Sequence, residues 1–381
     1  MPDIGKSTAP FFEKLVDLVG HLIFAEGEPF ITRLISDSTG FYMHVGILVV
    51  LSLLVAAVWA LLDKHRENDA ALLYALMVMV RYYLAMQLLM YGCSKIFKSQ
   101  FYLPEPNTLF TTLGETPKDL LYWSLMGASR SYSIFMGSME VMAAALLLFG
   151  RTKLMGALLS IFILVNVVAV NFSFDISVKL YACFLLLLAI VLVLPDVKML
   201  YRFFMGGKAV RLQVWEPSRT SKWRLIFKIG KACVIGLLCI DAIAPYWTGK
   251  QFNDDAILRP PLHGAYEVTN FVHNGDTLPP LLTDVQRWKR VFIHRRGYFI
   301  VQHMRDSMYD HALAYDTIQQ QLYLKQPETD VEDVLDYRRL NDSVLTLSGV
   351  YQQDTLRVTL KKIWLETLPL LQPGFHWTID Q

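Results

Sequence analysis

Two stretches of this chain each carry a charge inside an apolar run: Arg81–Lys95, RYYLAMQLLMYGCSK, and 136–150, MGSMEVMAAALLLFG. The first places Arg81 deep in one hydrophobic segment, and the second places Glu140 deep in another. A lone arginine at the centre of a membrane helix costs about 2.5–3.5 kcal/mol unless it finds a partner or water. We therefore predict that Arg81 and Glu140 face each other inside a helical membrane bundle.

The composition divides the chain into two parts. Of its 381 residues 54% are hydrophobic and 18% are charged, and the hydrophobic residues concentrate before about residue 248. This distribution predicts an α-helical transmembrane domain over 41–248 and a soluble domain over 249–381. The net charge of +2 is too small to indicate a nucleic-acid partner.

Six segments are long and apolar enough to cross ~30 Å of hydrocarbon. Before them, residues 11–24 have helical amphipathicity, so 1–40 is predicted to be an interfacial segment or a helix packed on the flank of the bundle. The predicted spans are 41–62, 71–97, 130–149, 154–172, 176–195 and 226–247.

The distribution of lysine and arginine predicts the orientation. The connection 196–231 is the most basic in the chain, which places it in the cytoplasm. The connection 98–129 then lies outside, where its aromatic residues are expected to fold over the mouth of the bundle. We predict a multi-pass protein of the bacterial inner membrane with its C-terminal domain on the periplasmic side. The bilayer is its first partner.

The predicted depths agree with a pair between Arg81 and Glu140. Arg81 is ~14 Å from the cytoplasmic end of its helix, and Glu140 is ~15 Å from the same side. A second polar group is expected near the outer ends of the spans, as a cavity open to the outside. The alternative is snorkelling lysines with an aspartate that starts a helix, which we favour for Lys179 and Asp175 but not for Asp241. The group consists of Lys95, Asp175, Lys179, Asp241, Asn166 and Asn171.

The cysteines and histidines limit the cofactors. Cys93 and Cys183 lie within two or three turns of the outer face and are candidate redox thiols, although buried cysteines more often act as small apolar residues. A b-type haem needs two axial ligands on facing spans, and only His44 lies within a predicted span, so haem is not expected. The other histidines lack metal-ligand spacing, and no metal site is predicted.

The tail changes from helical to alternating patterns. Asn274-Gly275 is a hairpin-type turn signal, and WKRVFIH, RRG and YFIVQHM (288–304) read as a hairpin. Further hairpins are expected over 309–325 and 334–363. About eight short strands joined by local turns predict an antiparallel meander, closed as a lipocalin-like barrel or packed as a sandwich.

The segment 70–205 resembles the DoxX-like family of four-helix membrane proteins. The resemblance rests on the run from Arg81 through Gly92 to Lys95, the Glu140 helix ending in LLLFG, and NFSFDISVKLYA at 171–182. It implies that Arg81, Lys95 and Glu140 form the polar motif, and that the protein works beside quinone or a redox enzyme. The remaining parts resemble longer forms from Bacteroidetes-type bacteria.

Three functions follow from these features. The first is a non-catalytic or redox-associated membrane subunit, linked to quinone by the resemblance and partnered by a redox enzyme or another envelope protein. The second is a membrane-anchored receptor whose β domain binds a lipid, a small molecule or a protein. The third is a transporter with an Arg81–Glu140 relay, which the lack of an inverted repeat disfavours. No catalytic motif is readable, so the sequence does not decide whether the protein is an enzyme.

Overall fold

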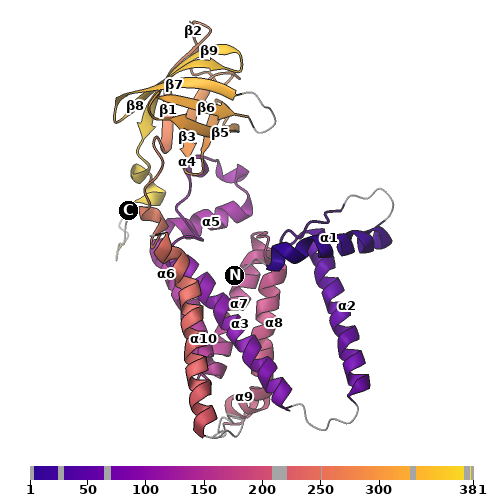
Figure 1. Ribbon diagram of the computed structural model, residues 1–381. Helices are drawn as coiled ribbons and strands as arrows, with labels where there is room; N and C mark the ends of the chain where they lie inside the picture. The colour runs from indigo at the N-terminus through magenta and orange to yellow at the C-terminus, as the bar shows by residue number, and fades with distance from the viewer. Residues whose placement is uncertain are drawn as a thin grey trace. The chain divides into compact units, whose positions relative to one another are not determined.

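The computed structural model describes residues 4–24, 30–63, 70–207, 221–249, 251–326, 332–372 and 378. The chain forms two compact units, shown in Figure 1. The first comprises residues 1–97 and 134–252, and the second comprises residues 98–133 and 253–381. The two units are described separately below.

The first unit is a helical membrane domain. Among the described residues, six helical segments are long and apolar enough to span a bilayer: Thr39–Leu62, Ala70–Ile96, Arg130–Leu148, Lys153–Ser173, Lys179–Phe204 and Lys228–Thr248. They confirm the predicted spans. The helices are α1 (Ile4–Ile23), α2 (Thr39–Leu62), α3 (Ala70–Ile96), α6 (Arg130–Leu148), α7 (Lys153–Ser173), α8 (Lys179–Val193), α9 (Val197–Phe204) and α10 (Ser221–Thr248).

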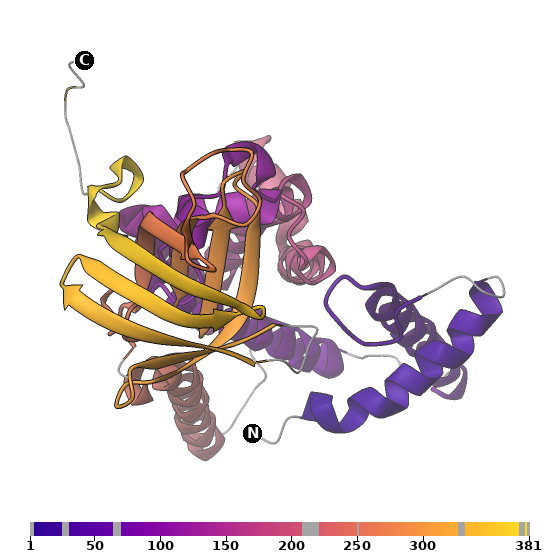
Figure 2. The same cartoon turned by 90° about the horizontal axis from the view of Figure 1, so that it is seen from above.

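The core of this unit lies where α3, α6, α7 and α8 pack together. Leu84, Ala144 and Ala189 are fully or almost fully buried there. In contrast, none of the hydrophobic window of α2 is buried. α1 lies across the start of α2, where the Phe12 and His44 rings meet at 4.5 Å (Figures 1 and 2). α2 therefore offers its apolar side chains to lipid.

The second unit contains an eight-stranded antiparallel barrel, closed by pairing of β1 with β9. Strand order follows the chain, and β2 extends one edge of β1 at the Asn274-Gly275 turn. The predicted meander and its closure are confirmed. The strands are β1 (Gly264–His273), β2 (Asp276–Thr277), β3 (Trp288–His294), β4 (Tyr298–His303), β5 (Met308–Asp316), β6 (Gln321–Lys325), β7 (Glu332–Asn341), β8 (Val344–Tyr351) and β9 (Asp354–Ile363).

Alternate side chains fill most of the barrel interior. Inward-facing residues such as Phe299, Leu335 and Val358 are completely buried, as period-two alternation requires. We call the end with the β4–β5 and β8–β9 turns the mouth, and the end with the β3–β4 and β7–β8 turns the base. Because the middle is packed, a ligand has room only near these ends.

Residues 98–133 belong with the barrel rather than with the helical domain. This segment includes α4 (Pro106–Leu109) and α5 (Lys118–Ala128). Two buried charges attach it. Lys98 is fully buried, with Nζ 2.5 Å from the Gly127 carbonyl and 3.8 Å from Asp255, and Glu105 binds residues of the barrel base. Sequence analysis placed 98–129 in the membrane domain because hydropathy does not register such long-range charge contacts.

Glu105 accepts several bonds from the barrel base. Arg295 Nε lies 2.7 Å and His263 Nε2 3.3 Å from its carboxylate, and His294 Nε2 lies 3.7 Å away. Burial alone raises the pKa of Glu105, but the His263 hydrogen bond, the charges of His294 and Arg295 and the Arg295 amide together lower it below 4.5. Burial lowers the pKa of His294 below 6.5.

These shifts predict that acid releases the 98–133 segment. Because the folded pKa of His294 is depressed, the unfolded state binds its proton first, so stability falls as pH drops below 6.5. The Glu105 contribution is present above 4.5 and is lost as pH falls through its lower folded value. Hydrogen exchange of the 101–110 amides should rise relative to intrinsic rates between pH 7.5 and 4. Glu105→Gln should raise exchange already at pH 7.5, and equal protection across this range would contradict the assignment.

Candidate functional site

The membrane domain contains one buried ion pair among its described residues, between α3 and α6. Lys95 Nζ lies 3.0 Å from Glu140 Oε1 and 2.8 Å from Oε2, and the two side chains are only 9% and 3% exposed. Nζ also lies 5.6 Å from the centre of the Tyr91 ring. The predicted acid is therefore paired, but its partner is Lys95 and not Arg81.

Two glycines make this pairing feasible. A Cβ on Gly137 would lie 2.5 Å from the Gly92 carbonyl oxygen and 2.9 Å from Lys95 Cβ, so the backbones of α3 and α6 touch. Lys95 and Glu140 each follow one of these glycines by three residues, on the same helix face. Side chains tilt toward the N-terminus of their own helix, so on antiparallel helices the two point toward each other.

Arg81 lies level with the end of α6 and not with Glu140, contrary to the predicted depths. One of its guanidinium nitrogens is 3.9 Å from the Cβ position of Gly150, and the guanidinium lies 5.2 Å from the Tyr82 ring centre. The error has a simple cause: α3 has 27 residues and α6 has 19, so the helix ends are not level. Measured from the Gly92–Gly137 contact, Arg81 is level with about residue 148.

The structure does not gather the predicted outer polar group into one site. Asp175 and Lys179 form a local ion pair at 2.7 Å, which neither alternative predicted, and Asp175 does not cap the start of α8. Asn171 is buried, whereas Asn166 and Asp241 are exposed on their helices. Sequence analysis missed Asp37, whose carboxylate accepts the backbone amides of Lys179 and Leu180 at the start of α8.

The four cysteines are free thiols. Cys93 is buried in the core of the helical domain, and Cys239 of α10 packs against the same core. Cys183 is half-buried on α8. Counting turns from the outer face did not select Cys239, which shares this core with Cys93.

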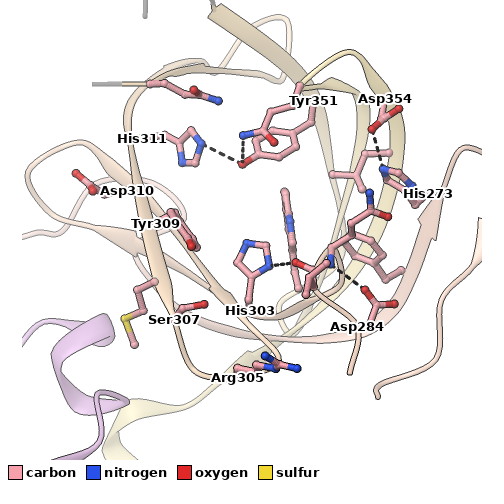
Figure 3. A pocket seen from close by; sticks show the side chains of 18 residues that line it. His273, Asp284, His303, Arg305, Ser307, Tyr309, Asp310, His311, Tyr351 and Asp354 are labelled. Carbon is pink, nitrogen blue, oxygen red and sulfur yellow. Dashed lines mark hydrogen bonds and ion pairs between the residues drawn. The ribbon is translucent and has the colours of Figure 1, made fainter. Parts of the chain in front are cut away.

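The second unit carries a cavity of about 690 Å³ at the barrel mouth, which we call the mouth pocket. Figure 3 shows its side chains converging from several strands and from the loop before β3. Its size is in the range of small-molecule sites. It is lined by Phe271, His273, Asp284, Val285, Gln286, Trp288, His303, Arg305, Ser307, Met308, Tyr309, Asp310, His311, Gln326, Tyr351, Gln352, Asp354 and Leu356.

The floor of the mouth pocket is aromatic. Trp288 packs edge-on against Tyr351, with ring centres 5.1 Å apart, and its ring centre lies 5.7 Å from that of Phe271. Above it, His311 Nε2 and the Tyr351 hydroxyl are 3.0 Å apart, as the dashed line in Figure 3 shows. Burial lowers the pKa of His311 and raises that of Tyr351. Both groups are therefore neutral at pH 7.

The wall of the pocket is held in place before any ligand arrives. Arg287 is buried and donates to the backbone carbonyls of Leu278 (2.9 Å) and Trp288 (3.0 Å), while Asp284 accepts the amides of Gln286 and Arg287. His303 Nδ1 lies 2.8 Å from the Val285 carbonyl, which can only accept, so Nδ1 carries the proton. A rigid wall lowers the entropic cost of binding.

The charges of the mouth pocket favour some ligands over others. Asp284, Asp310 and Asp354 against Arg305 give a formal charge of −2 with the histidines counted as neutral. The described part of the chain holds no group of three or more His, Cys, Asp or Glu placed to bind a metal ion. The pocket can thus hold a neutral or cationic molecule with an apolar part.

Sequence analysis did not find the mouth pocket because its residues are far apart in the chain. His273, His303 and His311 lie on β1, β4 and β5, and as a linear pattern they have no ligand spacing. The sequence did carry one signal: each histidine alternates in step with the inward-facing apolar residues of its strand and lies near a turn at the same end of the barrel. Using it requires the register of the barrel to be known.

Together these features define a multi-pass membrane protein that carries a closed eight-stranded β-barrel with a pocket at its mouth. A segment of 126 residues, 33% of the chain, is 33% identical to the uncharacterized protein YwoB of Bacillus subtilis (strain 168) and covers 77% of that protein. The chain therefore belongs to the same family as YwoB. No protein-family model matches it, and no solved structure matches it.

Proposed function

We propose that this protein is a membrane-anchored binding protein whose barrel captures a small neutral or cationic ligand at its mouth. The observation that carries the proposal is the mouth pocket: an open cavity with an aromatic floor and a preorganised polar wall. The helical domain would serve as the anchor, with the Lys95–Glu140 pair fixing α3 against α6.

The proposed location is the bacterial inner membrane with the barrel on the periplasmic side. The starts of α3 and α10 and the short helix α9 lie at one end of the helical domain (Figure 1). These are the ends next to the most basic connections of the chain. The excess of lysine and arginine supports a cytoplasmic position for that end.

The proposal predicts selective binding of an aromatic cation. In zwitterionic nanodiscs, saturation-transfer NMR should show the full chain binding benzyltrimethylammonium and not benzenesulfonate, because the pocket is acidic and aromatic. Ser307→Trp adds a large ring in the pocket and should weaken binding at least about tenfold.

Val350→Trp is the matched control. Val350 is exposed on the outer face of β8, next to Tyr351 in sequence, so this variant should bind like the wild type. Equal binding of both probe ions, or no difference between the two tryptophan variants, would rule out the mouth pocket as the binding site.

A second candidate function is a redox-associated subunit that works beside quinone, as the DoxX-like resemblance implies. The presence of Cys93 and Cys239 at one hydrophobic core favours it, because a thiol relay needs two cysteines in the same region. Quinone that co-purifies with the wild type and is lost in Cys93→Ala with Cys239→Ala would support this role. Retention of quinone in the double variant would show that the two thiols are not needed for quinone binding.

A further inference from the structure

The barrel base contains a second hollow, with a charge opposite to that of the mouth. This base pocket has a volume of about 210 Å³. Two cationic side chains line it, Arg339 from β7 and Lys362 from β9. The other lining residues are Leu262, Tyr266, Asn341, Asp342, Ser343, Val344, Leu345 and Trp364.

The two cations approach the hollow from either side of β8. Arg339 pairs in register with Leu345, and the backbone amide of Lys362 donates to the Ser343 carbonyl at 2.7 Å. Two strand spacings and a register offset of two residues separate their backbones by about 12 Å. Long side chains can bridge this distance to one small ligand between them.

Neither cation has an anionic partner within the described part of the chain. Lys362 Nζ lies 4.6 Å from the ring centre of Trp364, and Arg339 lines the hollow beside Tyr266. Asp342, the one carboxylate that lines the hollow, is exposed, and so is Arg339, so water screens both charges, whereas Lys362 is half-buried. The base pocket is thus a polar hollow with two positive charges and one negative charge, in which neither cation forms an ion pair among the described residues.

We propose that the base pocket binds a phosphate ester. The guanidinium of Arg339 can hold two phosphate oxygens, and the Lys362 ammonium can supply a second positive charge. The Ser343 hydroxyl and the Asn341 side chain lie in the same lining and add polar groups. The phosphate comes from a soluble ester or from an anionic lipid headgroup. Trp364 lines the hollow and is partly exposed, so it suits an amphiphile.

The test compares two double variants of the full chain. Arg339→Gln with Lys362→Gln removes both cations of the base pocket. Arg338→Gln with Lys361→Gln removes the same charge from the preceding residues, whose side chains face outward on the same strands. Glycerol 3-phosphate is titrated calorimetrically in phosphatidylcholine nanodiscs, and phosphatidylglycerol adducts are counted by native mass spectrometry.

The pocket variant should lose binding of at least one probe by about tenfold or more, and the outward-facing variant should not. Loss of glycerol 3-phosphate binding identifies a soluble ester, and loss of phosphatidylglycerol adducts alone identifies a lipid headgroup. Arg339→Lys keeps the charge but loses the two-pronged guanidinium contact, so it should weaken binding less than the double glutamine variant does. Equal behaviour of the two double variants, or no binding of either probe by the wild type, would overturn the proposal.

Discussion

Glu140→Gln is expected to lower the unfolding free energy of the protein by about 3 kcal/mol, because it leaves the Lys95 ammonium buried without its counter-ion. The two side chains are almost fully buried, so water cannot replace the lost partner. SDS titration of the protein in mixed micelles measures this free energy. Lys95→Gln should cost a similar amount, since it strands the carboxylate instead.

Asp175→Asn is the control for this prediction. Asp175 also forms an ion pair with a lysine, but its side chain is 82% exposed, and exposed pairs contribute about 0–1 kcal/mol. The variant should therefore unfold almost like the wild type. If Glu140→Gln also unfolds like the wild type, the α3–α6 pair does not stabilise the folded state.

Gly137→Ala is expected to have the second large effect, a loss of about 3 kcal/mol. The added methyl would meet the Gly92 carbonyl oxygen at 2.5 Å, and a backbone atom cannot rotate away as a side chain can. α3 and α6 would have to separate, which also lengthens the Lys95–Glu140 contact. Small residues at such crossings are typical of membrane helices.

Gly236→Ala provides the matched comparison in α10. No atom lies within 4 Å of the Cβ that it would add, so only the better helix propensity of alanine acts. This variant should be as stable as the wild type or slightly more stable in the same SDS titration. Equal losses of unfolding free energy in Gly137→Ala and Gly236→Ala would show that the close approach of α3 and α6 does not contribute to stability.

The sequence predicted the spans and the barrel well because both depend on local patterns. Apolar length is sufficient to identify a membrane helix, and turn residues such as Asn274-Gly275 mark the hairpins. Closure of the barrel followed from the need to remove two strand edges. Predicting these features does not require knowing which helices are in contact.

The candidate sites were harder to predict because they depend on relative height and register. Glu140 was correctly identified as a buried acid that needs a partner, but counting from the helix ends chose Arg81. The signal that decides for Lys95 is the pair of glycines one turn before each charge, at Gly92 and Gly137. Those glycines show where the helices touch, and the contact sets the heights of the side chains.

The most direct test of the account is a comparison of two double-mutant cycles, one with Lys95→Gln and Glu140→Gln and the other with Arg81→Gln and Glu140→Gln. Each cycle yields a coupling free energy from four SDS unfolding titrations. We predict a coupling of about 2 kcal/mol or more between Lys95 and Glu140 and a value near zero between Arg81 and Glu140. A large coupling to Arg81 with none to Lys95 would contradict the α3–α6 pairing on which the description of the membrane domain rests.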